Sequence, residues 1–269
     1  MTPSLHERFV ALHRSPTPLL LTNAWDAVSA RLWQELGATA VATSSGAVAW
    51  SRGYADGGKL PRADLLDSLQ GIVRVTSVPV TVDIEDGYSD DPGDVAALVV
   101  QIVAAGAVGI NLEDGGAAPE RLVAKIRAIR ARLSGAGLFI NARTDVYLHG
   151  LASGDAAVAM TIQRLAAYHD AGADGGFVPG LAQTDAAAAI AAAVPLALNV
   201  MTLPGLPPFA ALHAAGVRRI STGPALFKVA YHAAQDAAHA FLGGDPEPLS
   251  RPSLDYAVLN GLFAPRQER

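Results

Sequence analysis

The segment Val78–Tyr88, VPVTVDIEDGY, joins a short apolar run to three acidic residues that fall within four positions. An apolar run rich in β-branched residues predicts a strand that is buried on both faces. The acids Asp83, Glu85 and Asp86 follow at once, where a buried strand would emerge at an edge of its sheet. A helical pattern begins a few residues later, at about residue 92. The segment therefore predicts one strand–helix unit with charge gathered at the end of its strand.

Similar units recur along the whole chain. Apolar runs that end in polar residues occupy eight segments: 18–26, 38–46, 78–86, 107–115, 137–145, 173–180, 194–200 and 217–223. Between them, apolar residues recur at helical spacing, and glycines such as Gly106 and Gly172 stand where a helix would turn into the next strand. Eight parallel units in 269 residues predict an α/β protein with a (β/α)₈ TIM-type barrel.

The predicted domain organisation is a barrel over residues 1–230 and a C-terminal helical arm over 231–269. An open doubly wound sheet is the alternative, but no G-x-G-x-x-G motif follows the first run. The segment around residues 224–242 is apolar enough to pack on a second copy of the chain, as in a homo-oligomer (dimer or tetramer). It could equally close its own barrel.

Composition excludes several classes of function. The net charge of −5 and the lack of a basic run argue against a nucleic-acid partner. Cysteine is absent, which rules out disulfides and thiolate chemistry. The N-terminal segment has no apolar core typical of a signal peptide, and Gln101 and neighbouring glycines interrupt the longest apolar stretch. We expect a soluble cytoplasmic protein with no membrane partner.

In a barrel of this type, the active site forms at the C-terminal ends of the strands. The acids Asp83 and Glu85 end one strand and the pair Glu113 and Asp114 ends the next, so we expect these carboxylates to converge. Converging carboxylates repel one another unless a cation lies between them, and Mg²⁺ suits a site with few protein ligands. Helix capping is the alternative, and the pattern alone leaves both open.

Other strand ends supply candidate groups for an anionic substrate. Arg143 could grip a carboxylate or phosphonate, or it could form a structural salt bridge to Glu113 or Asp145. The small-residue turn Ser44, Ser45, Gly46 and Ala47 exposes backbone N–H groups for a carboxylate or oxyanion, or is simply a tight turn. Two further residues are candidates for the pocket wall or for packing and capping: Trp25 and Asn199.

The motifs VDIEDGY, INLEDG and NARTD, with TSSGAVAWSRGYADG upstream, resemble the isocitrate lyase/phosphoenolpyruvate mutase superfamily over about residues 15–230. The resemblance implies a Mg²⁺ ion, with Mn²⁺ as the second candidate. Asp83 would bind the ion directly, and Glu85 and Glu113 would bind its waters. The segment Ser45–Ala47 would hold the carboxylate of a 2-oxo acid, and Asp56 would polarise the substrate or handle a proton. Many members have Asp at the position of Glu85.

The chain also departs from that family. Isocitrate and methylisocitrate lyases carry a Lys-Lys-Cys-Gly-His signature on a long loop after the fourth strand, and here that loop is short and has no cysteine. The implied function is therefore a Mg²⁺-dependent lyase that cleaves a C–C bond next to a 2-oxo acid, through an enolate, in the manner of oxaloacetate decarboxylase or methylisocitrate lyase. The alternatives are phosphonopyruvate hydrolase or phosphoenolpyruvate phosphonomutase activity, and a non-catalytic protein that binds a 2-oxo acid.

Overall fold

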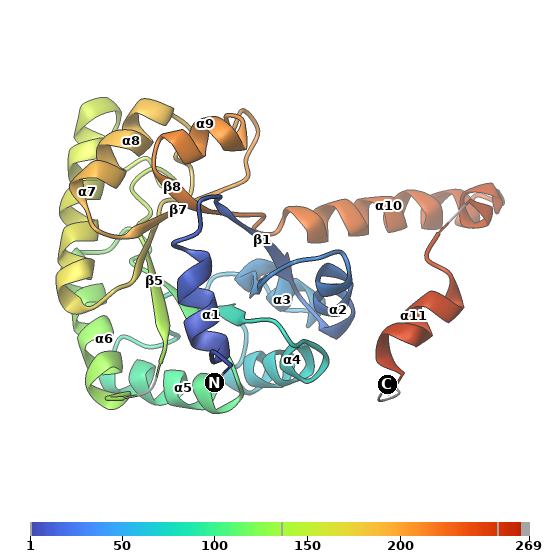
Figure 1. Ribbon diagram of the computed structural model, residues 1–269. Coiled ribbons are helices and arrows are strands. Elements are labelled where there is room, and N and C mark those ends of the chain that lie inside the picture. Colours follow the sequence, from blue (N-terminus) through green and yellow to red (C-terminus); the bar gives the residue numbers. More distant parts are fainter. Residues whose placement is uncertain (1, 136, 252, 265–269) are drawn as a thin grey trace.

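The eight predicted strands form one closed parallel barrel in sequence order (Figure 1). The structure is a computed structural model that describes residues 2–135, 137–251 and 253–264. The strands are β1 (Leu19–Ala24), β2 (Val41–Thr43), β3 (Val80–Asp83), β4 (Gly109–Glu113), β5 (Phe139–Arg143), β6 (Gly175–Phe177), β7 (Ala197–Met201) and β8 (Val217–Ser221). The prediction of a (β/α)₈ barrel is confirmed.

Helices surround the barrel and extend beyond it at the C-terminal end. They are α1 (Leu5–Leu12), α2 (Ala27–Glu35), α3 (Ser45–Ser51), α4 (Arg62–Val75), α5 (Pro92–Ala104), α6 (Pro119–Arg132), α7 (Gly154–Ala171), α8 (Thr184–Ala193), α9 (Phe209–Ala214), α10 (Ala225–Leu242), the 3-10 turn η1 (Glu247–Ser250) and α11 (Tyr256–Phe263). The turn predicted at 44–47 is the start of α3. Gly172 has φ +109°, the left-handed conformation that ends α7 and that glycine adopts at little cost. No described helix is both long and apolar enough to cross a membrane.

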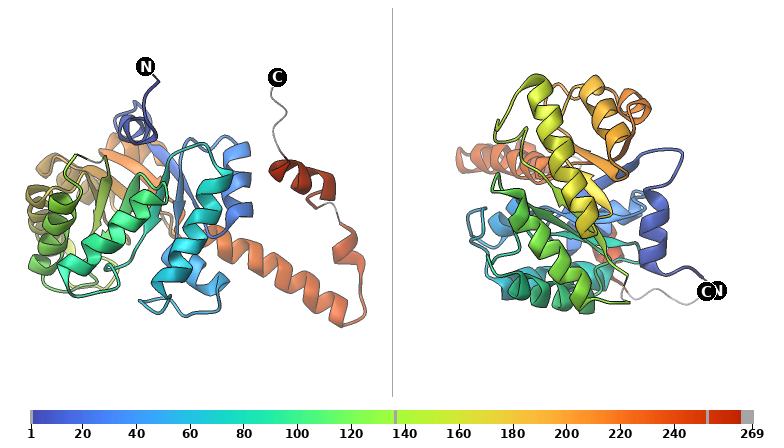
Figure 2. Two further views of the ribbon diagram at one scale, coloured as in Figure 1. Left: turned by 90° about the horizontal axis from the view of Figure 1, so that it is seen from below. Right: turned by 90° about the vertical axis from the view of Figure 1, so that its left-hand side faces the viewer.

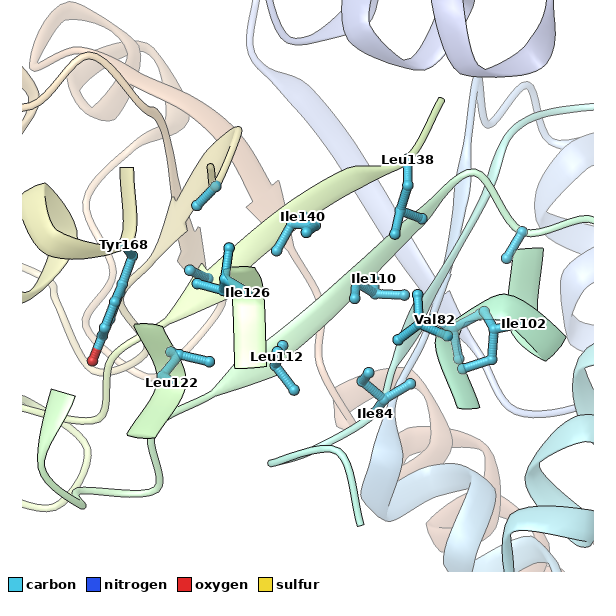
Figure 3. Packing of buried hydrophobic residues seen from close by; sticks show 14 of the residues in the cluster. Val82, Ile84, Ile102, Ile110, Leu112, Leu122, Ile126, Leu138, Ile140 and Tyr168 are labelled. Carbon is cyan, nitrogen blue, oxygen red and sulfur yellow. The ribbon is translucent and has the colours of Figure 1, made fainter. Parts of the chain in front are cut away.

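The main core lies between the strands and the surrounding helices. Val82, Ile110 and Ile140 project from the outer faces of neighbouring strands and pack against residues such as Ile126 and Tyr168 of the helical layer (Figure 3). Each of these side chains is almost fully buried. Burial of one such side chain contributes about 1.5–3 kcal/mol. This layer holds the strands in the register that places their C-terminal ends at one mouth.

The base of the barrel interior is filled with apolar side chains. There, Phe9 of α1 packs edge-to-face on Phe139 of β5, with ring centroids 5.3 Å apart. The next inward positions are polar and buried, and they are Asn111, Asn141, Asn199 and Arg219. Barrels of this type usually fill that space with branched apolar side chains. A polar layer directly below the mouth therefore needs a reason beyond packing.

The C-terminal arm follows the barrel through the long helix α10. The proposed boundary at residue 230 lies inside α10, which starts at Ala225 and projects away from the barrel (Figures 1 and 2). Phe227 anchors its first turn, because its ring lies 5.3 Å from that of Trp25 and 5.6 Å from that of Trp50. The chain then turns back, and Arg31 of α2 donates a hydrogen bond to the carbonyl of Leu262 in α11.

Candidate active site

A cavity of about 190 Å³ opens at the C-terminal ends of the strands. Its lining combines three charged side chains, several small polar residues and an apolar wall. These residues are Asn23, Ser44, Ser45, Gly46, Asp56, Asp83, Asn111, Arg143, Leu148, Phe177, Pro179, Met201, Ser221, Gly223 and Pro224. Of the residues predicted from sequence, the cavity brings together Ser44, Ser45, Gly46, Asp56, Asp83 and Arg143.

Asp83 is the last residue of β3 and points into the mouth. One of its oxygens, Oδ1, accepts the backbone N–H of Glu85 at 3.1 Å, and Oδ2 accepts an N–H of Asn111 at 3.2 Å. Burial raises the pKa of Asp83, although the positive charge of Arg143 acts in the opposite direction. The side chain is therefore a well-oriented carboxylate that burial destabilises in its charged form.

Glu85 and Asp56 add negative charge to the same region. Glu85 has φ +51°, an uncommon backbone conformation for a residue with a side chain, and such conformations gather at functional sites. Its carboxylate accepts the N–H of Gly58, and the hydroxyl of Tyr88 acts on it as a further hydrogen-bond donor. Burial and the charge of Asp56 both raise the pKa of Glu85.

The 52–61 loop brings Asp56 over the mouth, against the first turn of α3. A Cβ atom on Gly46 would lie only 3.0 Å from Oδ2 of Asp56, so a larger residue here would press on the side chain of Asp56. The N-terminal N–H groups of a helix lack partners within it, so Ser45 and Gly46 offer donors to a bound anion. Ala47 is buried and lies behind them, apart from the residues that line the cavity.

Arg143 is held between two carboxylates. Its Nη1 lies 2.5 Å from Oε2 of Glu113, and its Nε donates to Oδ1 of Asp145 at 2.7 Å. Burial raises the pKa of Glu113 to about 8, because it outweighs the effect of Arg143. The salt bridges considered as the alternative for Arg143 are thus present, yet the guanidinium also lines the cavity. The two carboxylates therefore fix the guanidinium in an orientation that can contact a bound anion.

Asp114 corrects the prediction that both acids at the end of β4 face the mouth. Its Oδ2 accepts the hydroxyl of Tyr168 at 2.7 Å and an N–H of Arg164 at 2.8 Å, both from α7. Oδ1 accepts the N–H groups of Gly116 and Asp145. Successive residues of a strand point to opposite faces, so Glu113 faces inward and Asp114 outward. Asp114 therefore holds the loops that follow β4 and β5 against α7.

Four other predicted residues are not among those that line the cavity: Trp25, Glu85, Glu113 and Asn199. Trp25 packs in an aromatic cluster with Phe227 and with Trp33, whose ring is 6.3 Å away. Asn199 is fully buried in the polar layer below the mouth, where its oxygen accepts an N–H of Asn141 at 3.0 Å. Trp25 therefore anchors α10, and Asn199 supports the floor of the site.

Sequence reasoning missed Asn111 and the apolar wall formed by Leu148, Phe177, Pro179 and Met201. Asn111 could have been found from the sequence, because it lies two residues before Glu113. Side chains two residues apart in a strand point to the same face. Leu148 belongs to the 144–153 loop, which packs against Gly180. The connection after β4 is short, as predicted, because α6 begins at Pro119.

The donors at the mouth fit a hard divalent cation. Asp56, Asp83, Glu85 and Glu113 crowd their negative charges together, while Arg143 is the single cation among the described lining residues. In the described ranges, no three His, Asp or Glu side chains are arranged to hold a metal ion by themselves. An ion would therefore keep several of its waters, and Mg²⁺ usually does so in proteins.

The chain is similar to several known proteins in sequence and in fold. The family described as phosphoenolpyruvate phosphomutase matches residues 9–242. The chain is 38% identical over 265 residues to the Mycobacterium tuberculosis protein Rv1998c, covering 97% of this chain and 98% of that one. It is 31% identical to an oxaloacetate decarboxylase of Bradyrhizobium, covering 82% and 80% of the two chains. The structure of a candidate phosphonomutase from Burkholderia cenocepacia matches with a TM-score of 0.83 and 40% identity, covering 88% of this chain and all of that one.

Proposed function

Because the chain belongs to the isocitrate lyase/phosphoenolpyruvate mutase superfamily, we propose that it is a Mg²⁺-dependent lyase that cleaves a C–C bond next to a 2-oxo acid. The observation that carries this proposal is the crowding of Asp56, Asp83 and Glu85 at the mouth, where burial and mutual repulsion raise the pKa values of Asp83 and Glu85. A cation with oxygen ligands would relieve this repulsion.

Asp83 would bind the ion directly, and Glu85 and Glu113 would bind its waters. When bound, the ion would supply Lewis acidity that stabilises the negative charge of the developing enolate. The N–H groups of Ser45 and Gly46 would hold the substrate carboxylate, and Arg143 would hold a second anionic group. Asp56 stands over the cavity, in a position to handle the proton that the enolate takes up.

The size and charge of the cavity favour a small substrate. At about 190 Å³ it suits an acid of four or five carbons, and Arg143 is the single cation among its described lining residues. The wall beside Arg143 is apolar at Leu148, Phe177 and Met201. A tricarboxylate such as isocitrate would leave charges unpaired against that wall, which is costly. Decarboxylation of oxaloacetate, or cleavage of a related small acid, therefore ranks first.

A second candidate is cleavage of a C–P bond, as in phosphonopyruvate hydrolase or phosphoenolpyruvate phosphonomutase. The family description and the likeness to a candidate phosphonomutase favour it. Arg143 could hold a phosphonate as readily as a carboxylate. Binding of a 2-oxo acid without turnover is the remaining alternative.

We expect NMR of the purified protein with Mg²⁺ to show conversion of oxaloacetate, beyond its spontaneous decay, to pyruvate and CO₂. Isocitrate and methylisocitrate should react at least about a hundredfold more slowly, because unpaired substrate groups cost several kcal/mol in the transition state. EDTA should abolish turnover, and added Mg²⁺ or Mn²⁺ should restore it.

Each other outcome points to an alternative. Turnover of phosphonopyruvate or phosphoenolpyruvate in place of oxaloacetate would favour the second candidate. An absence of turnover, with 2-oxo acids raising the melting temperature only when Mg²⁺ is present, would indicate a binding protein. Full activity in EDTA would contradict the metal-dependent mechanism.

We also propose that the C-terminal arm joins copies of the chain into a homo-oligomer. Exposed apolar residues line the arm on both sides of its turn, among them Tyr231, Phe241 and Leu242 on α10 and Tyr256 on α11. Apolar surface of this kind commonly marks a protein interface.

We expect the double substitution of Phe241 and Leu242 by Asp to convert a dimer or tetramer into smaller species in light scattering after size exclusion. Burying two carboxylates in an apolar interface opposes assembly. The matched control is Leu36→Asp, because Leu36 is equally apolar and 78% exposed but lies on the barrel surface. An unchanged mass for the arm variant would argue against this interface.

A further inference from the structure

Arg219 is a buried cation at the centre of the barrel. It projects inward from β8, and its side chain is fully inaccessible to solvent. Nη2 donates a hydrogen bond to Oδ1 of Asn111 at 3.1 Å, while Nε and Nη1 have no hydrogen-bond partner in the part of the chain that the structure describes. Burial lowers the pKa of Arg219 to about 9, despite the opposing effect of Asp83. Such a residue costs stability, which suggests that it serves another purpose.

The residues at the base of the barrel do little to neutralise the positive charge of Arg219. His13 is buried there, and burial together with the charge of Arg219 lowers its pKa to about 3. The imidazole is therefore neutral, and its Nδ1–H donates to the carbonyl of Phe9 at 2.8 Å. The anionic group whose charge acts on Arg219 is Asp83, at the other side of the polar layer.

The connection between Arg219 and Asp83 runs through the amide of Asn111. Oδ1 of Asn111 accepts from Arg219 and also from Nδ2 of Asn141, at 2.9 Å. Two donors on one atom require that atom to be the amide oxygen, because an NH₂ group cannot accept them. The NH₂ group of Asn111 must then face Asp83, and it donates to Oδ2 at 3.2 Å.

We propose that Arg219 is a positioning residue for the metal site, and that it acts by fixing Asn111 so that its amide orients the carboxylate of Asp83. This inference rests on the proposed function, since it takes Asp83 as the direct ligand of the ion. With Oδ2 held by Asn111 and Oδ1 by the N–H of Glu85, both oxygens of Asp83 have fixed directions. Partners of this kind that hold a metal ligand typically change metal affinity by 10–100-fold when removed.

The charge of Arg219 and its positioning effect should change the Mg²⁺ affinity in opposite directions when Arg219 is replaced. A positive charge below the site repels a cation, so loss of the charge alone would tighten Mg²⁺ binding. Loss of positioning would weaken it, because Asn111 could turn and Asp83 would lose a fixed donor. The sign of the change therefore separates the two effects.

The test is a calorimetric titration of the metal-free full-length protein with MgCl₂. We expect Arg219→Met to weaken Mg²⁺ binding by about 10–100-fold, while its melting temperature in EDTA stays equal to that of the wild type or rises. Arg219→Lys keeps a donor and should recover part of the affinity; it also serves if the Met variant does not fold. Asn111→Leu should weaken binding by a similar factor.

A double-mutant cycle tests the route through Asn111. If Arg219 acts through that amide, Arg219→Met should have no further effect on Mg²⁺ affinity in the Asn111→Leu background. The matched control is Arg164→Met, which removes an arginine with a nearly inaccessible side chain outside the cavity. It should lower the melting temperature and leave the Mg²⁺ affinity unchanged.

Several results would overturn the inference. Unchanged or tighter Mg²⁺ binding in Arg219→Met, beside normal binding by the wild type, would refute positioning and leave the proposed function intact. Additive losses in the double variant would refute the route through Asn111. A wild-type protein that binds no Mg²⁺ would refute the proposed function, and the inference with it.

Discussion

The Asp83→Asn variant is expected to lose turnover by about a thousandfold and to bind Mg²⁺ too weakly to measure. Asparagine keeps the shape of the side chain but removes the negative charge that would bind the ion directly. Loss of one preorganised group that stabilises a developing oxyanion commonly costs 10²–10³ in rate. The measurements are the rate of product formation by NMR and a calorimetric titration with MgCl₂.

The same variant should melt at a higher temperature than the wild type in EDTA. Burial raises the pKa of Asp83 above its value in the unfolded chain. The charged carboxylate therefore destabilises the fold increasingly as the pH rises above the unfolded value of about 4. A neutral side chain avoids this cost, so the gain in melting temperature should be larger at pH 8 than at pH 5. A loss of activity together with a gain in stability is a signature of a functional carboxylate.

Asp86→Asn provides the matched control from the same segment. Asp86 lies three residues further along, outside the cavity, with its side chain 49% exposed and 3.6 Å from Nζ of Lys125. Because Lys125 is buried, loss of this pair should cost some stability. Asp86 itself is half-exposed and lies outside the cavity, so water screens its charge, and Mg²⁺ affinity and turnover should stay within about twofold of the wild type. Equal losses in both variants, or normal turnover by Asp83→Asn, would contradict the assignment of Asp83.

The barrel itself could be predicted because its signals are local. Each strand is a short apolar run, each helix shows its own spacing, and residues such as Gly172 mark the turn between them. Since parallel strands joined by helices bring all their C-terminal ends to one side, Asp83 and Arg143 could be placed at one mouth without knowledge of any long-range contact.

The parts that could not be predicted depend on partners distant in sequence. Trp25 follows β1 and could as well have lined the cavity; its position is decided by Phe227, some 200 residues away along the chain. The ion pairs of Arg143 with Glu113 and Asp145 depend on the exact approach of two neighbouring strand ends. Strand periodicity could have revealed the inward side chains of Asn111 and Arg219, but not that they touch.

Asp114→Ala is expected to lower the free energy of unfolding by about 3–5 kcal/mol, the usual cost of breaking a buried ion pair by removing one partner. The side chain of Asp114 is inaccessible, and that of Arg164 is 11% exposed. The substitution would leave Arg164 and the hydroxyl of Tyr168 without their acceptor. It would also free the N–H groups of Gly116 and Asp145, which hold the connections around the mouth.

Urea denaturation at pH 7.5 would measure this loss, with Asp114→Asn as a milder variant and Asp90→Ala as the matched control. Asp90 pairs with Arg121 at 2.6 Å, but both side chains are more than half exposed, so its loss should cost no more than about 1 kcal/mol. Hydrogen bonds from Tyr168, Gly116 and Arg164 hold the pKa of Asp114 below its usual range despite burial. Its stabilising effect is therefore present above about pH 4 and disappears in acid. Equal costs for Asp114→Ala and Asp90→Ala would contradict the structural role. A loss of Mg²⁺ affinity in Asp114→Asn, at a free energy of unfolding equal to that of the wild type, would also contradict it.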